Sequence, residues 1–396
     1  MENKNSKTEL IPKTDSKNET ILINNKSISK PNDKQSFLIY HTLIAKGIAS
    51  LMLLYHHLLR EGNKFNKGFY NELIIFNINF RKYISIFFKI TTCSYTFLSG
   101  IGLYYSLIKL KSIKEMYKKC MKNFFRLMVI FWIILIFVFP KGLKTGLFNL
   151  KYSTIISCIF GIYGRKGNWW YIRMHFALLI YAPLIINLFK DTNYKKKLIP
   201  IIIFYFIYFI IKIFRTSITF NSMFSKIFFD YFFYFSYIDI ILSFISGILA
   251  AKYNIMLVYD NPNYECFYYC LFSIFSSVYI RWNLISQEGD TKIDFFIVPL
   301  FLLPITSLIS KKKIIANIIS LFGKHSTNFW FIHGYFYDNY YLDILSLPKY
   351  STLCYIWLII LTLISSYIIN IVQIPIINFI NSKGFNYKGY FHFIKI

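Results

Sequence analysis

Apolar runs of about 20 residues recur along almost the whole of this 396-residue chain, and they constrain its fold more than any other feature. A helix of about 20 apolar residues spans a hydrocarbon core of roughly 30 Å. Only 16% of the residues are charged, whereas soluble domains carry about 25%. The sequence therefore predicts an all-α, polytopic membrane protein and excludes a string of soluble domains.

The apolar segments predict about ten transmembrane helices, which we place at residues 38–59, 83–108, 123–140, 169–189, 198–214, 231–250, 264–281, 294–310, 316–337 and 352–374. A shorter apolar segment, 152–163, is expected to be re-entrant or interfacial. Residues 1–36 are polar and without periodicity, which predicts a disordered cytosolic tail. The transmembrane domain is expected to occupy 37–380, and 381–396 to form a short basic cytosolic tail.

The formal net charge is +27, and its cations gather in loops expected on one side of the membrane. These are the segments 109–122, 195–197 and 311–313 and the C-terminal tail. Cytoplasmic loops of membrane proteins are rich in Lys and Arg, so the excess indicates topology rather than a nucleic-acid partner. The bilayer is the expected partner, and both termini are expected in the cytosol.

Two ionisable side chains share one face of the first predicted helix. Lys46 and His57 are eleven residues apart, which places them within roughly 20° on a helix and about 16 Å apart along its axis. Lys46 is expected near the cytosolic interface and His57 in the outer half. Ionisable groups in a bilayer usually face a bundle interior or a wet cavity, and a histidine there can take a proton from a hydroxyl. On these grounds alone, His56 and His57 could equally be interfacial residues at the helix end.

Lys119, Lys122 and Arg126 form a second constellation, at positions i, i+3 and i+7 of one helical face entering the third predicted span. Such a cationic face at the inner surface suits the phosphates of coenzyme A, which cannot cross the bilayer. Plain positive-inside charge would explain the same residues. Cys266 and Cys270 lack a second Cys or His pair, so we expect no metal site.

The stretch from Lys46 to His57 resembles the opening motif of the acyltransferase 3 family, integral-membrane O-acyltransferases of bacterial surface polysaccharides. Three further stretches are similar to motifs of that family, in the same order: 96–102, 168–172 and 322–333. The joint pattern covers about residues 37–380. Asn123 stands where the family usually has the first Arg of an Arg-x-x-Arg motif ending at Arg126, and Lys119 and Lys122 are the available substitutes.

The resemblance implies transfer of an acyl group, expected to be acetyl, from acyl-coenzyme A to a hydroxyl of a surface polysaccharide or its lipid-linked precursor. His57 would be the catalytic residue, while Lys46 and the three cations Lys119, Lys122 and Arg126 would hold the donor. Acyl-coenzyme A would act as co-substrate, with no tightly bound cofactor, in a bacterial cell membrane. The expected carbohydrate-binding residues are Trp170, Tyr171, Arg173 and His333, because aromatic rings stack on sugars; the same aromatics could instead form an interfacial belt.

Two other classes of function fit parts of the same pattern. A polysaccharide or lipid-linked sugar exporter would also need a wet, aromatic-lined cavity, but it would need neither a base at His57 nor coenzyme A. A receptor or scaffold accounts less well for a lysine and a histidine on one face of a membrane helix.

The charge pattern predicts that both ends of the chain lie in the cytosol, so that it crosses the membrane an even number of times. Single cysteines at positions 20 and 390, probed with a membrane-impermeant maleimide in intact cells, should both react only after the membrane is opened. Labelling of one end in intact cells would contradict this topology.

Overall fold

The protein is described here by a computed structural model, which covers residues 31–60, 74–75, 78–144, 146, 151–161, 170–190, 238–259, 264–284, 293–337 and 341–384. Apart from a two-residue antiparallel pairing of β1 (Ile74–Ile75) with β2 (Ile78–Asn79), the regular structure in these ranges is helical. The helices in chain order are α1 (Pro31–Arg60), α2 (Phe80–Phe87), α3 (Thr91–Leu107), α4 (Ile113–Lys144), α5 (Tyr152–Ile159), α6 (Trp170–Lys190), α9 (Ile238–Lys252), α10 (Ile255–Val258), α11 (Tyr264–Leu284), α12 (Asp294–Ser310), α13 (Lys313–Lys324), α14 (Ser326–Tyr337), α15 (Leu342–Leu345) and α16 (Ser351–Gly384).

Five of the described helical segments are long and apolar enough to cross a bilayer: Leu38–Arg60, Tyr83–Leu107, Ile113–Lys144, Tyr171–Lys190 and Ser351–Phe379. Ile240–Lys252 and Asp294–Ser310 are shorter apolar helices. Helix length and hydropathy thus make the chain a multi-pass membrane protein. The predicted helix at 198–214 lies outside the described residues, as do residues 1–30 and 385–396 of the two predicted tails.

Several expected segments have other bounds in the structure: α4 begins ten residues before its predicted span, and α16 ends ten residues after its own, inside the predicted C-terminal tail. Helix α1 begins at Pro31, inside the predicted N-terminal tail. The segment 316–337 was expected to be one helix, but it is broken at His325 into α13 and α14. The break follows Gly323, a residue that weakens a helix.

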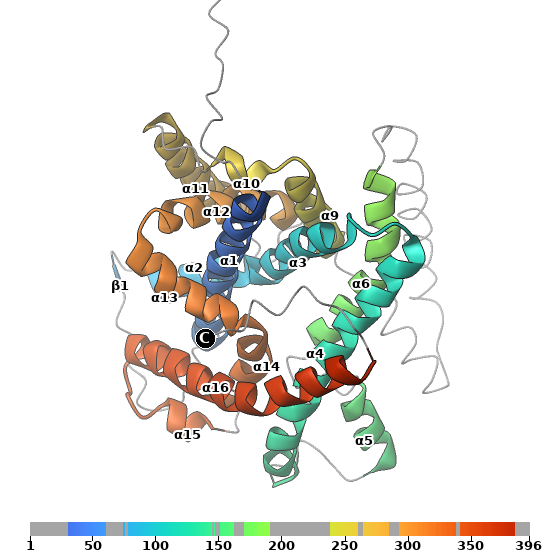
Figure 1. The fold of residues 1–396 in the computed structure, drawn as a ribbon. Coiled ribbons are helices and arrows are strands. Elements are labelled where there is room, and N and C mark those ends of the chain that lie inside the picture. The colour runs from blue at the N-terminus through green and yellow to red at the C-terminus, as the bar shows by residue number, and fades with distance from the viewer. Residues whose placement is uncertain are drawn as a thin grey trace, which may run out of the picture.

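Helix α1 is central, in contact with α2, α3, α12, α13, α14 and α16 (Figure 1). Its apolar residues enter all three clusters of buried side chains: Ile44 belongs to a cluster with residues of α3, α9 and α12, Leu53 to one with residues of α4 and α14, and Leu58 to one with residues of α14 and α16. Polar side chains of α1 such as Ser50 and His56 are therefore buried in the bundle interior.

Paired glycines let two pairs of helices approach closely. A Cβ atom on Gly47 of α1 would meet the carbonyl of Ile319, and one on Gly323 of α13 would meet the carbonyl of Leu43. Helices α3 and α9 cross in the same reciprocal way, with Gly100 against Phe244 and Gly247 against Phe97. Small residues at such crossings allow the backbone contact that drives helix association in membranes.

A buried ion pair joins three further helices. Arg281 of α11 is fully buried, and its Nε donates to Asp294 Oδ1 of α12 at 2.9 Å. Its Nη1 also donates to the carbonyl of Ile86 in α2 at 2.9 Å. A charge inside a bundle needs such a partner, so this pair ties α2 to α11 and α12 at the end of α1 that carries the histidines.

Gly100 and Gly102 offer a matched test of the α3–α9 crossing. Gly100→Ala should lower the free energy of unfolding by about 1–3 kcal/mol, because the new methyl group forces the two backbones apart. Gly102 has nothing within 4 Å of an added Cβ, so Gly102→Ala should be neutral or stabilise by up to roughly 1 kcal/mol. Thermal unfolding of both variants in the same detergent measures the difference; equal stabilities would rule out the close crossing.

Candidate functional site

His57 and His333 lie side by side in the bundle, and we call them the histidine pair. Their ring centroids are 5.0 Å apart, although the residues come from α1 and α14. Tyr337, one turn beyond His333, stacks on His57 with centroids 5.3 Å apart and planes 8° from parallel. The structure thus brings together two of the residues predicted for the site.

The hydrogen bonding of His333 fixes which of its nitrogens is available. Its Nδ1 lies 2.9 Å from the carbonyl of Phe329, an acceptor, so Nδ1 carries the proton. Nε2 is buried and has no hydrogen-bond partner within the described residues. A neutral imidazole held in this tautomer presents Nε2 as an acceptor.

His56 is hydrogen-bonded to α2, although its ring also lies edge-on to that of His57, with centroids 5.1 Å apart. Its Nδ1 donates to the carbonyl of Ser85 in α2 at 2.6 Å, and the Ser85 hydroxyl donates to the carbonyl of His56 at 3.0 Å. Its side chain is 5% exposed, whereas that of His57 is only partly buried. His56 therefore anchors α2 to α1, and His57 is the histidine that faces α14.

From His57 back toward Lys46, a row of polar and aromatic side chains continues the site along α1. The Ser50 hydroxyl donates to the carbonyl of Lys46 at 2.8 Å, so the Tyr95 hydroxyl, also at 2.8 Å, must donate to Ser50 Oγ. The Tyr95 ring lies 5.1 Å from that of Trp330, three residues before His333. This row therefore connects Lys46 with the histidine pair, the two ends of the helix face predicted from the sequence.

Lys46 lies eight residues into the span Leu38–Arg60, about 12 Å along the helix axis at 1.5 Å per residue. It interacts electrostatically with His175 of α6.

The predicted carbohydrate-binding residues occupy different places. Tyr171 contacts Trp330, with ring centroids 4.5 Å apart, and stacks on His175 at 5.8 Å. It therefore faces the interior rather than an interfacial belt. Arg173 is buried in α6, and the side chain of Trp170 lies outside the described part of the structure.

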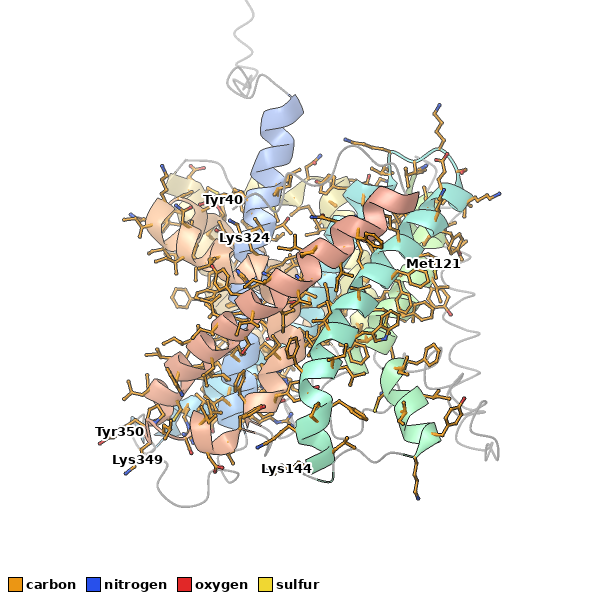
Figure 2. All side chains as sticks on the ribbon, turned by 60° about the horizontal axis from the view of Figure 1, so that its bottom comes forward. Tyr40, Met121, Lys144, Lys324, Lys349 and Tyr350 are labelled. Atoms are coloured by element: carbon orange, nitrogen blue, oxygen red, sulfur yellow. The ribbon has the colours of Figure 1, made fainter. Side chains whose placement is uncertain are left out.

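The predicted donor-binding cations lie together on α4, and we call them the basic cluster. Lys119 interacts electrostatically with Lys122 and Arg126, as the helical spacing indicates. They occupy the first half of α4, whose start lies at the upper end of the bundle in Figure 2, near Met121, whereas Lys144 lies at the lower end. Lys46 is not part of this cluster; it belongs to the row that ends at the histidine pair.

Arg81 is a buried cation just outside the span Tyr83–Leu107, at the end of α1 that carries the histidines. Burial lowers the pKa of its guanidinium, and the neighbouring ionisable group is Tyr55. Its Nε and Nη1 have no hydrogen-bond partner within the described residues. A buried guanidinium in this state can hold an anionic group.

Sequence reasoning missed Ser50, Trp330 and Tyr337. Ser50 could have been found, because it lies four residues after Lys46 and seven before His57 on the same face. Likewise, Trp330 and Tyr337 lie three residues before and four after His333. Among the described residues, no three His, Cys, Asp or Glu side chains are grouped to hold a metal ion.

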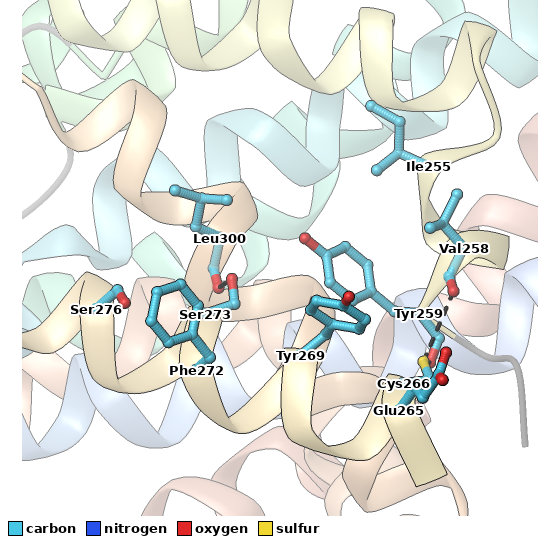
Figure 3. A pocket seen from close by; sticks show the side chains of 10 residues that line it. All are labelled: Ile255, Val258, Tyr259, Glu265, Cys266, Tyr269, Phe272, Ser273, Ser276 and Leu300. Carbon is cyan, nitrogen blue, oxygen red and sulfur yellow. Dashed lines mark hydrogen bonds between the residues drawn. The ribbon is translucent and has the colours of Figure 1, made fainter. Parts of the chain in front are cut away.

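An open groove of about 520 Å³ lies elsewhere, between α10, α11 and α12. Tyr259, Tyr269, Phe272 and Leu300 line it, with Glu265 and Cys266 at one end (Figure 3). The groove contains no histidine or basic residue and belongs to the exposed aromatic face of α11. We therefore place the candidate site at the histidine pair and not at this groove.

Comparisons with protein families, with curated proteins and with solved structures give no match. The arrangement of the side chains is therefore the basis for assigning a function.

The two adjacent histidines should differ in their contribution to stability. His56→Ala should lower the free energy of unfolding by about 1–3 kcal/mol, because the buried Ser85 carbonyl loses its donor. His57→Ala should cost less, since its ring is partly exposed, although it contacts the rings of Tyr337 and His333. Thermal unfolding in detergent compares the two; a larger loss for His57→Ala would reverse the assignment.

Proposed function

We propose that the chain is a membrane O-acyltransferase that moves an acyl group, expected to be acetyl, from acyl-coenzyme A to a hydroxyl of a surface polysaccharide or its lipid-linked precursor. The proposal includes about ten transmembrane helices with cytosolic termini, in a bacterial cell membrane. The observation that carries it is the histidine pair, which places a partly exposed imidazole against a buried one with a free acceptor nitrogen.

The chemistry requires a base for the acceptor hydroxyl. His57 takes the hydroxyl proton while the oxygen attacks the thioester carbonyl carbon. The carbon–sulfur bond then breaks, and the departing thiolate takes the proton back from the His57 imidazolium. His333 Nε2 accepts a hydrogen bond from the protonated ring, and Tyr337 holds the plane of His57 by stacking.

The charge distribution supports the path of each substrate. The basic cluster at the start of α4 suits the phosphates of the donor, and the opposite end of α1 carries the histidine pair and Arg81. The resemblance of 46–57 to the acyltransferase 3 motif supports the same roles. An exporter of polysaccharide or lipid-linked sugar would not need a general base such as His57.

We predict that His57→Ala lowers acyl transfer by about 10² to 10⁴, because a general base is lost. His56→Ala should keep most of the transfer per folded molecule, since His56 faces α2. The measurement is transfer of radiolabelled acetyl from acetyl-coenzyme A to cell-surface glycan in membranes, normalised to folded protein.

Comparing His57→Ala with His56→Ala tests the role of His57, and the wild-type protein distinguishes acyl transfer from export. Equal transfer in both variants, or a loss confined to His56→Ala, would remove His57 from the mechanism. Absence of any donor-dependent transfer by the wild-type protein, in cells whose glycan changes when the gene is deleted, would favour export.

A further inference from the structure

A network of amide and hydroxyl side chains lies where α13 breaks and α14 begins, and it packs against α16. We call it the amide cluster; its members are His325, Asn328, Ser366, Asn370 and Gln373. Asn328 Nδ2 lies 2.8 Å from Ser366 Oγ and donates to Asn370 Oδ1 at 2.9 Å. His325 Nδ1 lies 2.8 Å from Ser366 Oγ and 3.3 Å from Asn370 Nδ2.

Counting donors and acceptors leaves the cluster with unused oxygens. Asn370 Oδ1 accepts from both Asn328 and Gln373, so the amide hydrogens are directed toward members of the cluster itself. Asn328 Oδ1 and Gln373 Oε1 are buried and have no partner among the described residues. Asn328 is 3% exposed. Buried carbonyl oxygens without donors are costly, so the cluster is built for a group that brings N–H or O–H donors.

The position of the cluster relates it to both parts of the proposed site. Helix α16 runs from Tyr350 at the lower end of the bundle to the upper end, where it passes α4 (Figure 2). Ile369 of α16 packs in one buried cluster with Met128 and Phe131 of α4. Gln373, one turn further, therefore lies toward the half of α4 that carries the basic cluster.

Asn328 connects the cluster to the other part of the site. It precedes His333 by five residues on α14, which is about 7.5 Å along the helix axis. The amide cluster thus lies between the basic cluster and the histidine pair. A donor that enters at the basic cluster and reacts at the histidine pair must cross this level of the bundle.

We propose, on the basis of the acyltransferase function above, that the amide cluster binds the pantetheine arm of the acyl donor. Pantetheine carries two secondary amides, whose N–H groups match the two unused oxygens of Asn328 and Gln373. A metal cation is a poorer match, because the five members of the cluster bring no carboxylate and Lys324 is adjacent in sequence to His325.

Binding of two probes tests the proposal: coenzyme A, and adenosine 3′,5′-bisphosphate, which has the nucleotide phosphates but no pantetheine. In nanodiscs, Gln373→Met should weaken coenzyme A about tenfold, corresponding to about 1.4 kcal/mol, and leave the bisphosphate unchanged. Asn328→Leu is the second variant, with the same expected pattern. Asn317→Leu, at an exposed amide of α13 outside the cluster, is the matched control and should change neither affinity.

The outcomes below distinguish a failure of the pantetheine proposal from a failure of the acyltransferase function on which it rests. Joint neutralisation of Lys119, Lys122 and Arg126 should weaken both probes. If the wild-type protein binds coenzyme A but Gln373→Met and Asn328→Leu bind it equally well, the amide cluster is not the pantetheine site, and the acyltransferase proposal survives. If the wild-type protein binds neither probe, the acyltransferase proposal itself fails. Stabilisation of the wild type by Na⁺, lost in Gln373→Met, would assign the cluster to a cation and overturn the inference.

Discussion

The close crossing of α1 and α13 at Gly47 and Gly323 is the contact on which the candidate site depends. Because neither residue carries a Cβ, the two backbones meet directly. The chain then breaks at His325, and α14 passes along α1 so that His333 meets His57. A side chain at either glycine would separate α1 from α13 and move the histidine pair apart.

Several polar side chains in the bundle interior are paired with one another. Ser50 and Tyr95 bond to each other, Arg281 is paired with Asp294, and His56 is bonded to Ser85. Inside a bilayer such groups have no water to bond with, so each must find a partner in the protein. His333 Nε2, Asn328 Oδ1 and Gln373 Oε1 are among the buried atoms that have no such partner within the described residues, and our proposals assign these three to substrate atoms.

These features give one account of how two substrates could meet. The donor would bind by its phosphates at the start of α4 and extend along the amide cluster, so that its thioester reaches the histidine pair. The acceptor hydroxyl would approach from the other end of α1, near Arg81. In the proposed mechanism, α1 would provide the base, α14 would fix its orientation, and α4 and α16 would hold the donor.

The sequence by itself determined the membrane-spanning class, because apolar length and charge placement act locally and can be read residue by residue. It also determined that Lys46 and His57 share a face, and that Lys119, Lys122 and Arg126 share another, since a helix has a fixed period. Only the tertiary structure decided that His57, not His56, meets His333, and that Tyr171 faces inward. It alone brought Asn328 to Ser366 and Asn370, 38 and 42 residues further along the chain. Such contacts depend on how helices cross and where one breaks, and these are set by backbone approach at glycines that no local pattern measures.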